Sequence, residues 1–397
     1  MKKKALSELC DILIGRTPSR SVSEYWGKGY KWVSISDMKE EVISSTKEEI
    51  TEEAIKAIRC RKIPKGTLLL SFKLSVGKLA FAGTDLYTNE AIAALNVKDP
   101  TILHPKFLYY ALKTIKFVGG NQAVMGITLN SKSLAELKIP LPPLDDQIRI
   151  AAVLTRAEKL TAKRKESIKA LDEFLKSTFL EMFGDPVKNE KGWKKNELGN
   201  VSHIQGGLQV TTKRASNPIE LPYLRVANVY RDLLDLREIK TIKVTEAEAA
   251  RVCLEKGDIL VVEGHGNPTE IGRSAVWDGS IQNCLHQNHL IRVRVNADYA
   301  LPVFISYYIN SASGRQQMFR AGKTTSGLNT ISSKNVKETL VLLPPLPLQT
   351  QFAAIVEKVE SLKFRYAQSL TELEKLYGSL SQRAFKGELD LSGVRAK

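Results

Sequence analysis

Apolar residues recur every three or four positions through two long segments, each of which follows a pair of prolines. The first segment follows Pro142-Pro143 and the second follows Pro344-Pro345. Proline disfavours helix in the residues before it, and this spacing is typical of an amphipathic helix. Two long helices are therefore expected, ending near Gly184 and Gly387. Their apolar positions are Val153, Leu154, Ala157, Ile168, Leu171, Leu175 and Met182, then Val356, Val359, Tyr366, Leu370, Leu373, Tyr377, Leu380 and Ala384.

The two helical segments belong to a repeat. At an offset of 202 residues the sequence matches itself without a gap through the proline pairs and the helices. Further upstream the match is looser, and its offset rises from about 191 at Gly66/Gly257 to 199 at Asn89/Asn288. This period is far longer than that of a solenoid, so it indicates a tandem duplication of a globular domain followed by a long helix. The repeated frame residues, which are candidates for fixing the helix start or contacting a partner, are Pro142, Pro143 and Gln147, then Pro344, Pro345 and Gln349.

The globular parts show strand-like runs between glycine turns and two short helices that follow prolines. "TLLLSF" and "KLAFAG" are expected strands, with "DILVVEG" and "IRVRVNA" as their analogues in the second half, and "PKFLYYALKTI" and "LPVFISYYINS" are expected helices. The predicted fold class is α/β (mixed α+β), with two similar globular domains. The expected boundaries are a first globular domain at 1–143, a first long helix at 144–185, a second domain at 186–345, a second long helix at 346–388 and a tail at 389–397.

Each long helix carries an apolar stripe that it cannot bury alone. About 39 residues at 1.5 Å per residue make a rod of about 58 Å. We expect the two rods to pair as an antiparallel coiled coil, which would place the globular domains at opposite ends with pseudo-two-fold symmetry. The alternative is that each rod packs on its own globular domain.

The chain is basic, with a formal net charge of +16 over 397 residues. A soluble protein of this charge usually meets an anionic partner, and nucleic acid is the first candidate. The four cysteines form no CxxC pair, which fits a reducing cytoplasm. No apolar run reaches the roughly 20 residues of a membrane span, so no membrane partner is expected.

The motifs that could carry chemistry are weak. "GKTT" at Gly322–Thr325 has Gln317 where a phosphate-binding loop requires glycine, and "NCLHQNHL" offers Cys284, His286 and His289 without an evident fourth zinc ligand. The loop "AGKTTSGLNTISSK" and its counterpart "GGNQAVMGITLNSK" are better explained as DNA-backbone contacts or plain linkers. We find no methyltransferase, nuclease or hydrolase motif. The chain is therefore predicted to bind and position, with no catalytic residue, no metal site and no cofactor of its own.

Basic and amide side chains in the loops of the two domains are the candidates for DNA contact. Arginine and lysine suit guanine and phosphate, and glutamine and asparagine suit adenine. The candidates are Arg16, Thr17, Arg20, Lys28, Lys31, Lys73 and Lys78 in the first domain, and Gln209, Lys213, Arg214, Arg225, Asn267, Arg273 and Lys323 in the second.

The chain resembles the specificity (S) subunits of type I restriction–modification systems. The resemblance lies in the doubled "LPPL..Q" before a long helix, the similar domain openings at Leu6 and Leu198, and the total length. It implies that each globular domain is a target recognition domain for one half of a bipartite double-stranded DNA site, and that the coiled coil sets the spacer.

The resemblance also implies partners. Two methyltransferase (M) subunits would dock on the chain, and restriction (R) subunits would add translocation and cleavage. The S-adenosylmethionine, ATP and Mg would belong to those subunits. Two alternatives stay open at this point: a stand-alone DNA-modifying enzyme, and a tandem scaffold that binds only proteins.

Overall fold

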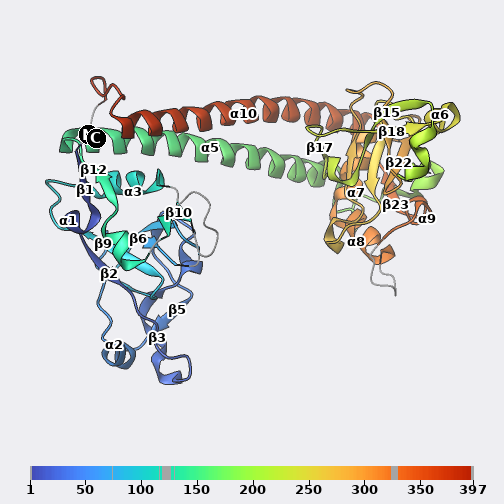
Figure 1. Ribbon diagram of the computed structural model, residues 1–397. Coiled ribbons are helices and arrows are strands. Elements are labelled where there is room, and N and C mark those ends of the chain that lie inside the picture. The colour runs from blue at the N-terminus through green and yellow to red at the C-terminus, as the bar shows by residue number, and fades with distance from the viewer. Residues whose placement is uncertain are drawn as a thin grey trace. The chain divides into compact units, whose positions relative to one another are not determined.

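The computed structural model describes residues 2–73, 75–115, 117–118, 127–128, 130–322 and 330–394. The chain forms two compact units, Met1–Glu166 with Gln368–Lys397, and Ser167–Ala367. Each unit holds one globular domain and one half of each of two long helices (Figure 1).

The first domain is built on a five-stranded sheet and a three-stranded sheet. Leu68, Leu69 and Leu70 are buried in the middle of the larger sheet, since the strand is covered on both faces. The larger sheet has the order β2 (Cys10–Ile14), β9 (Ile92–Val97), β6 (Leu68–Ser71), β7 (Leu79–Ala82), β4 (Val42–Ile43), and the smaller has the order β5 (Glu48–Ile50), β3 (Trp26–Val33), β8 (Tyr87–Thr88). Two further pairs are β1 (Lys3–Ala5) with β12 (Lys138–Pro140), and β10 (Phe117–Val118) with β11 (Ile127–Thr128).

Four short helices lie among the described residues of this domain. They are α1 (Leu6–Leu9), α2 (Glu52–Ile58), α3 (Pro105–Lys113) and α4 (Ser131–Ala135). Pro105 starts α3, where its missing N–H costs nothing, and the side chain of Thr51 caps α2 by accepting from Ala54 N. Single-turn 3₁₀ segments lie at Ser23–Tyr25 and Ile35–Asp37.

The second domain repeats this plan. Its larger sheet has the order β14 (Ser202–Gly206), β22 (Leu290–Val295), β19 (Ile259–Val262), β20 (Ser274–Val276), and its smaller sheet has the order β18 (Lys240–Val244), β15 (Ile219–Leu224), β21 (Leu285–His286). Two further pairs are β13 (Lys194–Glu197) with β23 (Leu340–Leu343), and β16 (Val229–Tyr230) with β17 (Leu233–Leu234). Its helices are α6 (Glu246–Val252), α7 (Pro302–Asn310), α8 (Ala312–Ala321) and α9 (Ser333–Lys337), with 3₁₀ turns at Leu198–Asn200, Thr212–Ser216, Val226–Asn228 and Pro268–Glu270.

The predicted strands and short helices are present, but one predicted correspondence is wrong. "IRVRVNA" forms β22, which lies between β14 and β19 as β9 lies between β2 and β6. The counterpart of β7 is β20. In the first domain β7 pairs antiparallel with β6, and in the second β20 pairs antiparallel with β19, which is the counterpart of β6. Gly15 and Gly207 directly follow the equivalent strands β2 and β14, and a Cβ there would lie 2.1 Å from Thr88 O and 2.2 Å from His286 O. Sequence matching placed this glycine pair correctly because only glycine permits that close approach.

The two long helices are α5 (Leu144–Phe183) and α10 (Leu346–Lys386). Gly184 and Gly387 follow them with φ of 77° and 82°, which confirms the predicted stops. The helices run antiparallel within each unit. In the first unit Glu158 and Lys165 of α5 lie beside Tyr377 and Glu374 of α10, with Lys165 2.8 Å from Glu374. In the second unit Asp172 and Phe183 of α5 contact Lys363 and Phe352 of α10, with Asp172 2.7 Å from Lys363. The prediction of antiparallel pairing is thus confirmed within each unit.

The ends of both helices also enter the domain cores. In the second unit Phe179 and Phe183 of α5 pack against Phe304 of α7, and Phe352 of α10 packs against Phe183. In the first unit, Ile150 and Leu154 of α5, with Ala384 of α10, join the core of the first domain. The alternative prediction, in which the rods pack on the globular domains, is therefore partly correct: each unit buries an end of both helices.

Candidate nucleic-acid interface

The repeated glutamines hold the start of each long helix against the domain before it. Gln147 accepts a hydrogen bond from His104 N at 2.9 Å and donates to Ile102 O and Pro142 O, both at 2.9 Å. Gln349 does the same in the second unit: it accepts from Leu301 N at 2.8 Å and donates to Pro344 O at 2.8 Å and Tyr299 O at 3.4 Å.

Both glutamine residues are fully buried, with 0% of their surface exposed. His104 and Leu301 are the N-cap residues of α3 and α7, so each amide ties the start of a long helix to the start of a domain helix. A buried amide with its donors and acceptor engaged has nothing left for a partner. The glutamines therefore act as frame residues that fix the helix start.

In the first domain, the loop that follows β2 carries Arg16, Thr17 and Arg20, all exposed. Arg16 Nη1 donates to Ile58 O, the last carbonyl of α2, at 2.6 Å. Thr17 donates to the Glu90 carboxylate, and Arg20 forms an ion pair with Glu48. This loop is therefore held at three points and presents two arginines at the surface.

The first-domain lysines lie on neighbouring loops. Lys28, Lys73 and Lys78 are exposed and Lys31 is half-buried. Their contacts are Lys31 Nζ with Ser44 O at 2.6 Å, Lys78 Nζ with Ile35 O at 3.2 Å, and Lys73 Nζ 5.4 Å from the Phe72 ring centroid. Lysines on exposed loops suit contacts with DNA phosphates.

In the second domain, the loop that follows β14 carries Gln209, Lys213 and Arg214. Arg214 Nε donates to Gln209 O at 2.6 Å and Nη1 pairs with Glu248 of α6 at 2.9 Å. Gln209 and Lys213 are exposed, whereas the Arg214 side chain is 16% exposed. Arg214 therefore mainly fixes the conformation of this loop, and Gln209 and Lys213 stay at the surface.

The remaining second-domain candidates differ in accessibility. Asn267 is exposed and caps a 3₁₀ turn by accepting from Thr269 N at 3.1 Å, and Arg225 pairs with Glu238 at 3.2 Å. Arg273 is buried, since its side chain is 7% exposed, and it bonds Val226 O at 3.0 Å and Glu270 at 3.3 Å. The structure thus places Arg273 in the interior. Lys323, and most of the two Gly/Ser/Thr loops predicted to touch the DNA backbone, lie outside the described residues.

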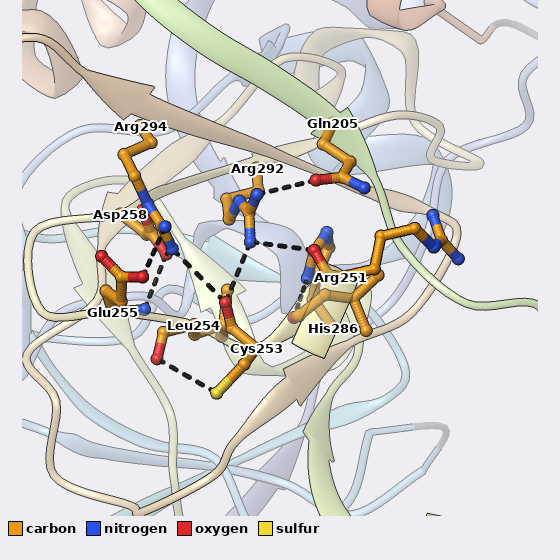
Figure 2. A network of polar contacts seen from close by, with 10 residues as sticks. Gln205, Arg251, Cys253, Leu254, Glu255, Asp258, His286, Arg292 and Arg294 are labelled. Carbon is orange, nitrogen blue, oxygen red and sulfur yellow. Dashed lines mark hydrogen bonds and ion pairs between the residues drawn. The ribbon is translucent and has the colours of Figure 1, made fainter. Parts of the chain in front are cut away.

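A buried polar network that the sequence analysis missed supports the second domain (Figure 2). Arg292 of β22 is 4% exposed; its Nη1 donates to Cys253 O at 2.9 Å and its Nη2 to Gln205 Oε1 at 2.7 Å. His286 Nδ1 lies 3.1 Å from Val252 O. The contacts with Val252 O and Cys253 O both satisfy carbonyls at the C-terminal end of α6, where the positive charge of Arg292 is also favourable.

The neighbouring strand residue Arg294 forms the second part of the network. Its guanidinium makes a bidentate pair with Asp258, with N–O distances of 2.7 and 2.8 Å, and Nη1 reaches Glu255 at 2.5 Å. At the matching register of β9 the first domain has Ala94 and Asn96. The signal in the sequence was "IRVRV", an apolar strand with two arginines, but their partners are distant in the sequence: Gln205 of β14 and the segment from Cys253 to Asp258.

Histidine and cysteine side chains of the predicted "NCLHQNHL" cluster have other roles. Burial lowers the pKa of His286 to about 4, and burial raises the pKa of Cys284 to about 12. His289 Nδ1 lies 3.1 Å from Glu263. Across the part of the chain that the structure describes, no three histidine, cysteine or acidic side chains come together to hold a metal ion.

The helix pair carries a polar cluster in each unit. In the first unit, Glu158 of α5 accepts from Tyr110 Oη at 2.7 Å and Lys113 Nζ at 2.5 Å. In the second, Lys363 of α10 bridges Asp172 of α5 at 2.7 Å and Glu360 at 2.8 Å.

Among the described residues, no helix combines the length and apolar character needed to cross a bilayer.

Comparison with known proteins places this geometry in a family. The family model described as the type I restriction modification DNA specificity domain matches residues 1–170 and 190–375. The MjaIX specificity subunit of Methanocaldococcus jannaschii is 23% identical over 97% of this chain and 93% of its own length. The EcoKI specificity subunit of Escherichia coli is 30% identical over 64% of this chain and 58% of its own length.

Solved structures share the fold. The type I S subunit of M. genitalium superimposes with a TM-score of 0.56 at 16% identity, over 97% of this chain and 96% of that one. A chain from a structural study of complex assembly and conformational transition in a type I restriction–modification system gives a TM-score of 0.59 at 18% identity, over 98% of each chain.

Proposed function

The chain belongs to the type I restriction–modification DNA specificity family, and from this premise we propose that its two globular domains each read one half of a bipartite DNA site. One observation carries the proposal: the buried frame is repeated while the exposed loops diverge. Gln147 and Gln349 make equivalent contacts, but the loops that follow β2 and β14 present different side chains. Two readers of unequal half-sites need a shared frame and different surfaces.

Charge supports DNA as the ligand. The formal net charge is +16, and the exposed loop candidates are lysines, arginines and amides. Phosphate contacts of this kind supply most of the affinity, and base-edge contacts supply the sequence preference. In this proposal the same loops make both the phosphate contacts and the base contacts.

We further infer that the antiparallel helices set the spacer and receive two methyltransferase subunits. Large apolar side chains remain exposed on both helices, which is unfavourable unless a partner covers them. They are Leu160, Phe174 and Leu180 on α5 and Phe364 and Leu376 on α10. Restriction subunits are further partners in the same proposal.

In this proposal the chain is not itself an enzyme. The methyltransferase subunits bring S-adenosylmethionine and act on adenine, and the restriction subunits bring ATP and Mg. We expect the assembly to act in the cytoplasm. The chain supplies sequence choice and geometry.

The test compares the purified full chain with its reconstituted methyltransferase complex on a random-sequence DNA library. We expect the complex to methylate DNA at a two-part site and the chain alone to methylate nothing. Methylation by the chain alone would favour a stand-alone enzyme instead. DNA affinity that is absent or indifferent to salt would point to a protein-binding scaffold, because phosphate contacts weaken steeply with salt.

A further inference from the structure

We propose that Arg20 reads a guanine in the half-site of the first domain, and that Trp26 and Glu48 hold its guanidinium in the reading position. This inference rests on the proposed function and assigns a base and a domain to one residue. Its basis is a stacked and ion-paired arginine at the domain surface, beside a groove flanked by lysines.

The guanidinium of Arg20 is stacked on an aromatic pair. Its Cζ lies 3.7 Å from the Trp26 ring centroid and 5.5 Å from that of Trp32, and the two indoles meet edge to face at 5.0 Å. Both indole N–H groups also hold the loop itself: Trp26 donates to Ser19 O at 3.0 Å and Trp32 donates to Arg16 O at 3.1 Å. Backbone and side chain of the loop are therefore fixed by the same two residues.

Glu48 fixes the rotation of the guanidinium. Its two carboxylate oxygens accept from Nη1 and from Nη2, the latter at 2.9 Å. The hydrogen bond from Arg20 lowers the pKa of Glu48, so the carboxylate stays ionised at neutral pH.

This pair uses two of the five N–H donors of arginine and leaves the edge formed by Nε and the outer Nη2 proton. Among the described residues Nε of Arg20 has no hydrogen-bond partner, and 56% of the side chain is exposed. Two coplanar donors on one edge match O6 and N7 of guanine in the major groove.

A groove of about 430 Å³ lies beside the stacked arginine, lined by Trp26, Gly27, Lys28, Lys47, Glu48 and Glu49. At the groove, β3 has a register shift between Trp26 and Tyr30, and Gly27 has a φ of 149°. Lys28, within this bulge, is exposed. Lys28 and Lys47 flank the groove, where they suit the phosphates next to a base that Arg20 reads.

The described residues of the second domain do not form this arrangement. Its strands β15 and β18 pair in continuous register from Ile219 to Tyr223, without a bulge. Its loop arginine, Arg214, is 16% exposed and staples the loop. Since the stacked and ion-paired arginine is found in the first domain, we expect it to act on the half-site of that domain alone.

The experiment uses the full chain reconstituted with its methyltransferase partner on the random-sequence library. Arg20→Lys keeps the charge but cannot present two coplanar donors. We expect preference for guanine at one position of one half-site to fall by about tenfold to a hundredfold, with the other half-site unchanged. Arg61→Lys, an exposed arginine of the same domain, is the matched control and should leave the site unchanged.

A second variant tests the positioning. Glu48→Gln should relax the same guanine position less than Arg20→Lys does, because the guanidinium remains but is held less firmly. Relaxation at a different position would overturn the role of Glu48.

The outcomes separate the two proposals. If the wild-type complex selects no two-part site, the proposed function fails. If the wild type selects such a site and Arg20→Lys selects it with unchanged base frequencies, this inference alone is overturned. A uniform loss of affinity without changed preference would also overturn it, because that result identifies a phosphate contact. An unchanged second half-site shows that the variant complex is folded.

Discussion

At the scale of the residue, the buried glutamine of each unit is the side chain on which the helix start depends. We expect Gln147→Met to leave His104 N and the carbonyls of Ile102 and Pro142 without partners. Each unpaired buried group costs about 1–3 kcal/mol. The expected result is a lower unfolding midpoint, together with faster amide exchange in α3 and in the first turn of α5.

The control for this substitution is Gln382→Met, which changes an exposed glutamine of α10. It should leave the midpoint and the exchange rates within error. Exchange that stays slow in α3 after Gln147→Met would contradict the frame role, whatever the midpoint does.

His286 and Asp232 give the second domain opposing responses to pH. Burial lowers the pKa of His286 to about 4, and burial raises the pKa of Asp232 to about 6, although Ser306 and Asn310 donate to its carboxylate. As pH falls from 6.5 towards 4, the unfolded state binds protons to His286 more readily than the folded state, so stability falls. As pH falls from 6 to 4, the folded state binds a proton to Asp232 more readily than the unfolded state does, so this group raises stability.

Asp232→Asn should therefore remove the opposing contribution and leave the pH dependence of stability that comes from His286. In that variant we expect the second domain to lose up to about 3 kcal/mol between pH 6.5 and 4, from a pKa difference of about 2.5. The wild type should change less, because the two groups offset each other. The measurement is denaturant unfolding followed by the fluorescence of Trp277, which is buried in this domain, in chains with the other tryptophans replaced by phenylalanine. A flat profile in Asp232→Asn would contradict the assignment.

At the scale of the element, two phenylalanines of α10 separate packing from docking. Phe352 is fully buried and contacts Phe179, Phe183 and Tyr307, whereas Phe364 is 64% exposed. We expect Phe352→Ala to lower the free energy of unfolding of the second unit by about 3–5 kcal/mol.

Phe364→Ala is the matched variant on the same helix. Its stability should stay within about 0.5 kcal/mol of wild type, and binding of the methyltransferase subunit, measured by calorimetry, should weaken. Unchanged binding would contradict docking at this side chain and leave the packing argument intact.

The long helices were predictable from sequence, and the buried polar network was not. Prolines and glycines are local signals, and the three-to-four spacing extends over many turns, so the bounds of α5 and α10 were predicted within a few residues. The order of strands depends on distant pairings, which is why β22 was matched to the wrong partner. Arg273 was predicted as a DNA contact because Val226 O, the group it binds, lies far from it in the sequence, and the buried role of Arg292 was missed because Cys253 O is equally remote.

At the scale of the whole molecule, the helices and the DNA spacer should change length together. Insertion of one heptad next to Lys165 in α5 and one next to Glu374 in α10 keeps these facing positions paired. Seven residues add about 10.5 Å, which corresponds to about three base pairs at 3.4 Å each. The preferred spacer should lengthen by about that amount in the random-library experiment, with both half-sites unchanged.

The affinity of the lengthened complex should fall even at its best spacer. Three base pairs also rotate one half-site relative to the other by about 100°, since B-DNA repeats every 10 to 10.5 base pairs. A heptad keeps the helix faces nearly in phase and cannot supply that rotation. A lengthened spacer with weaker binding is therefore the signature of helices that measure distance. An unchanged spacer would show that distance is set by the partner subunits, with the helices acting only as their docking surface.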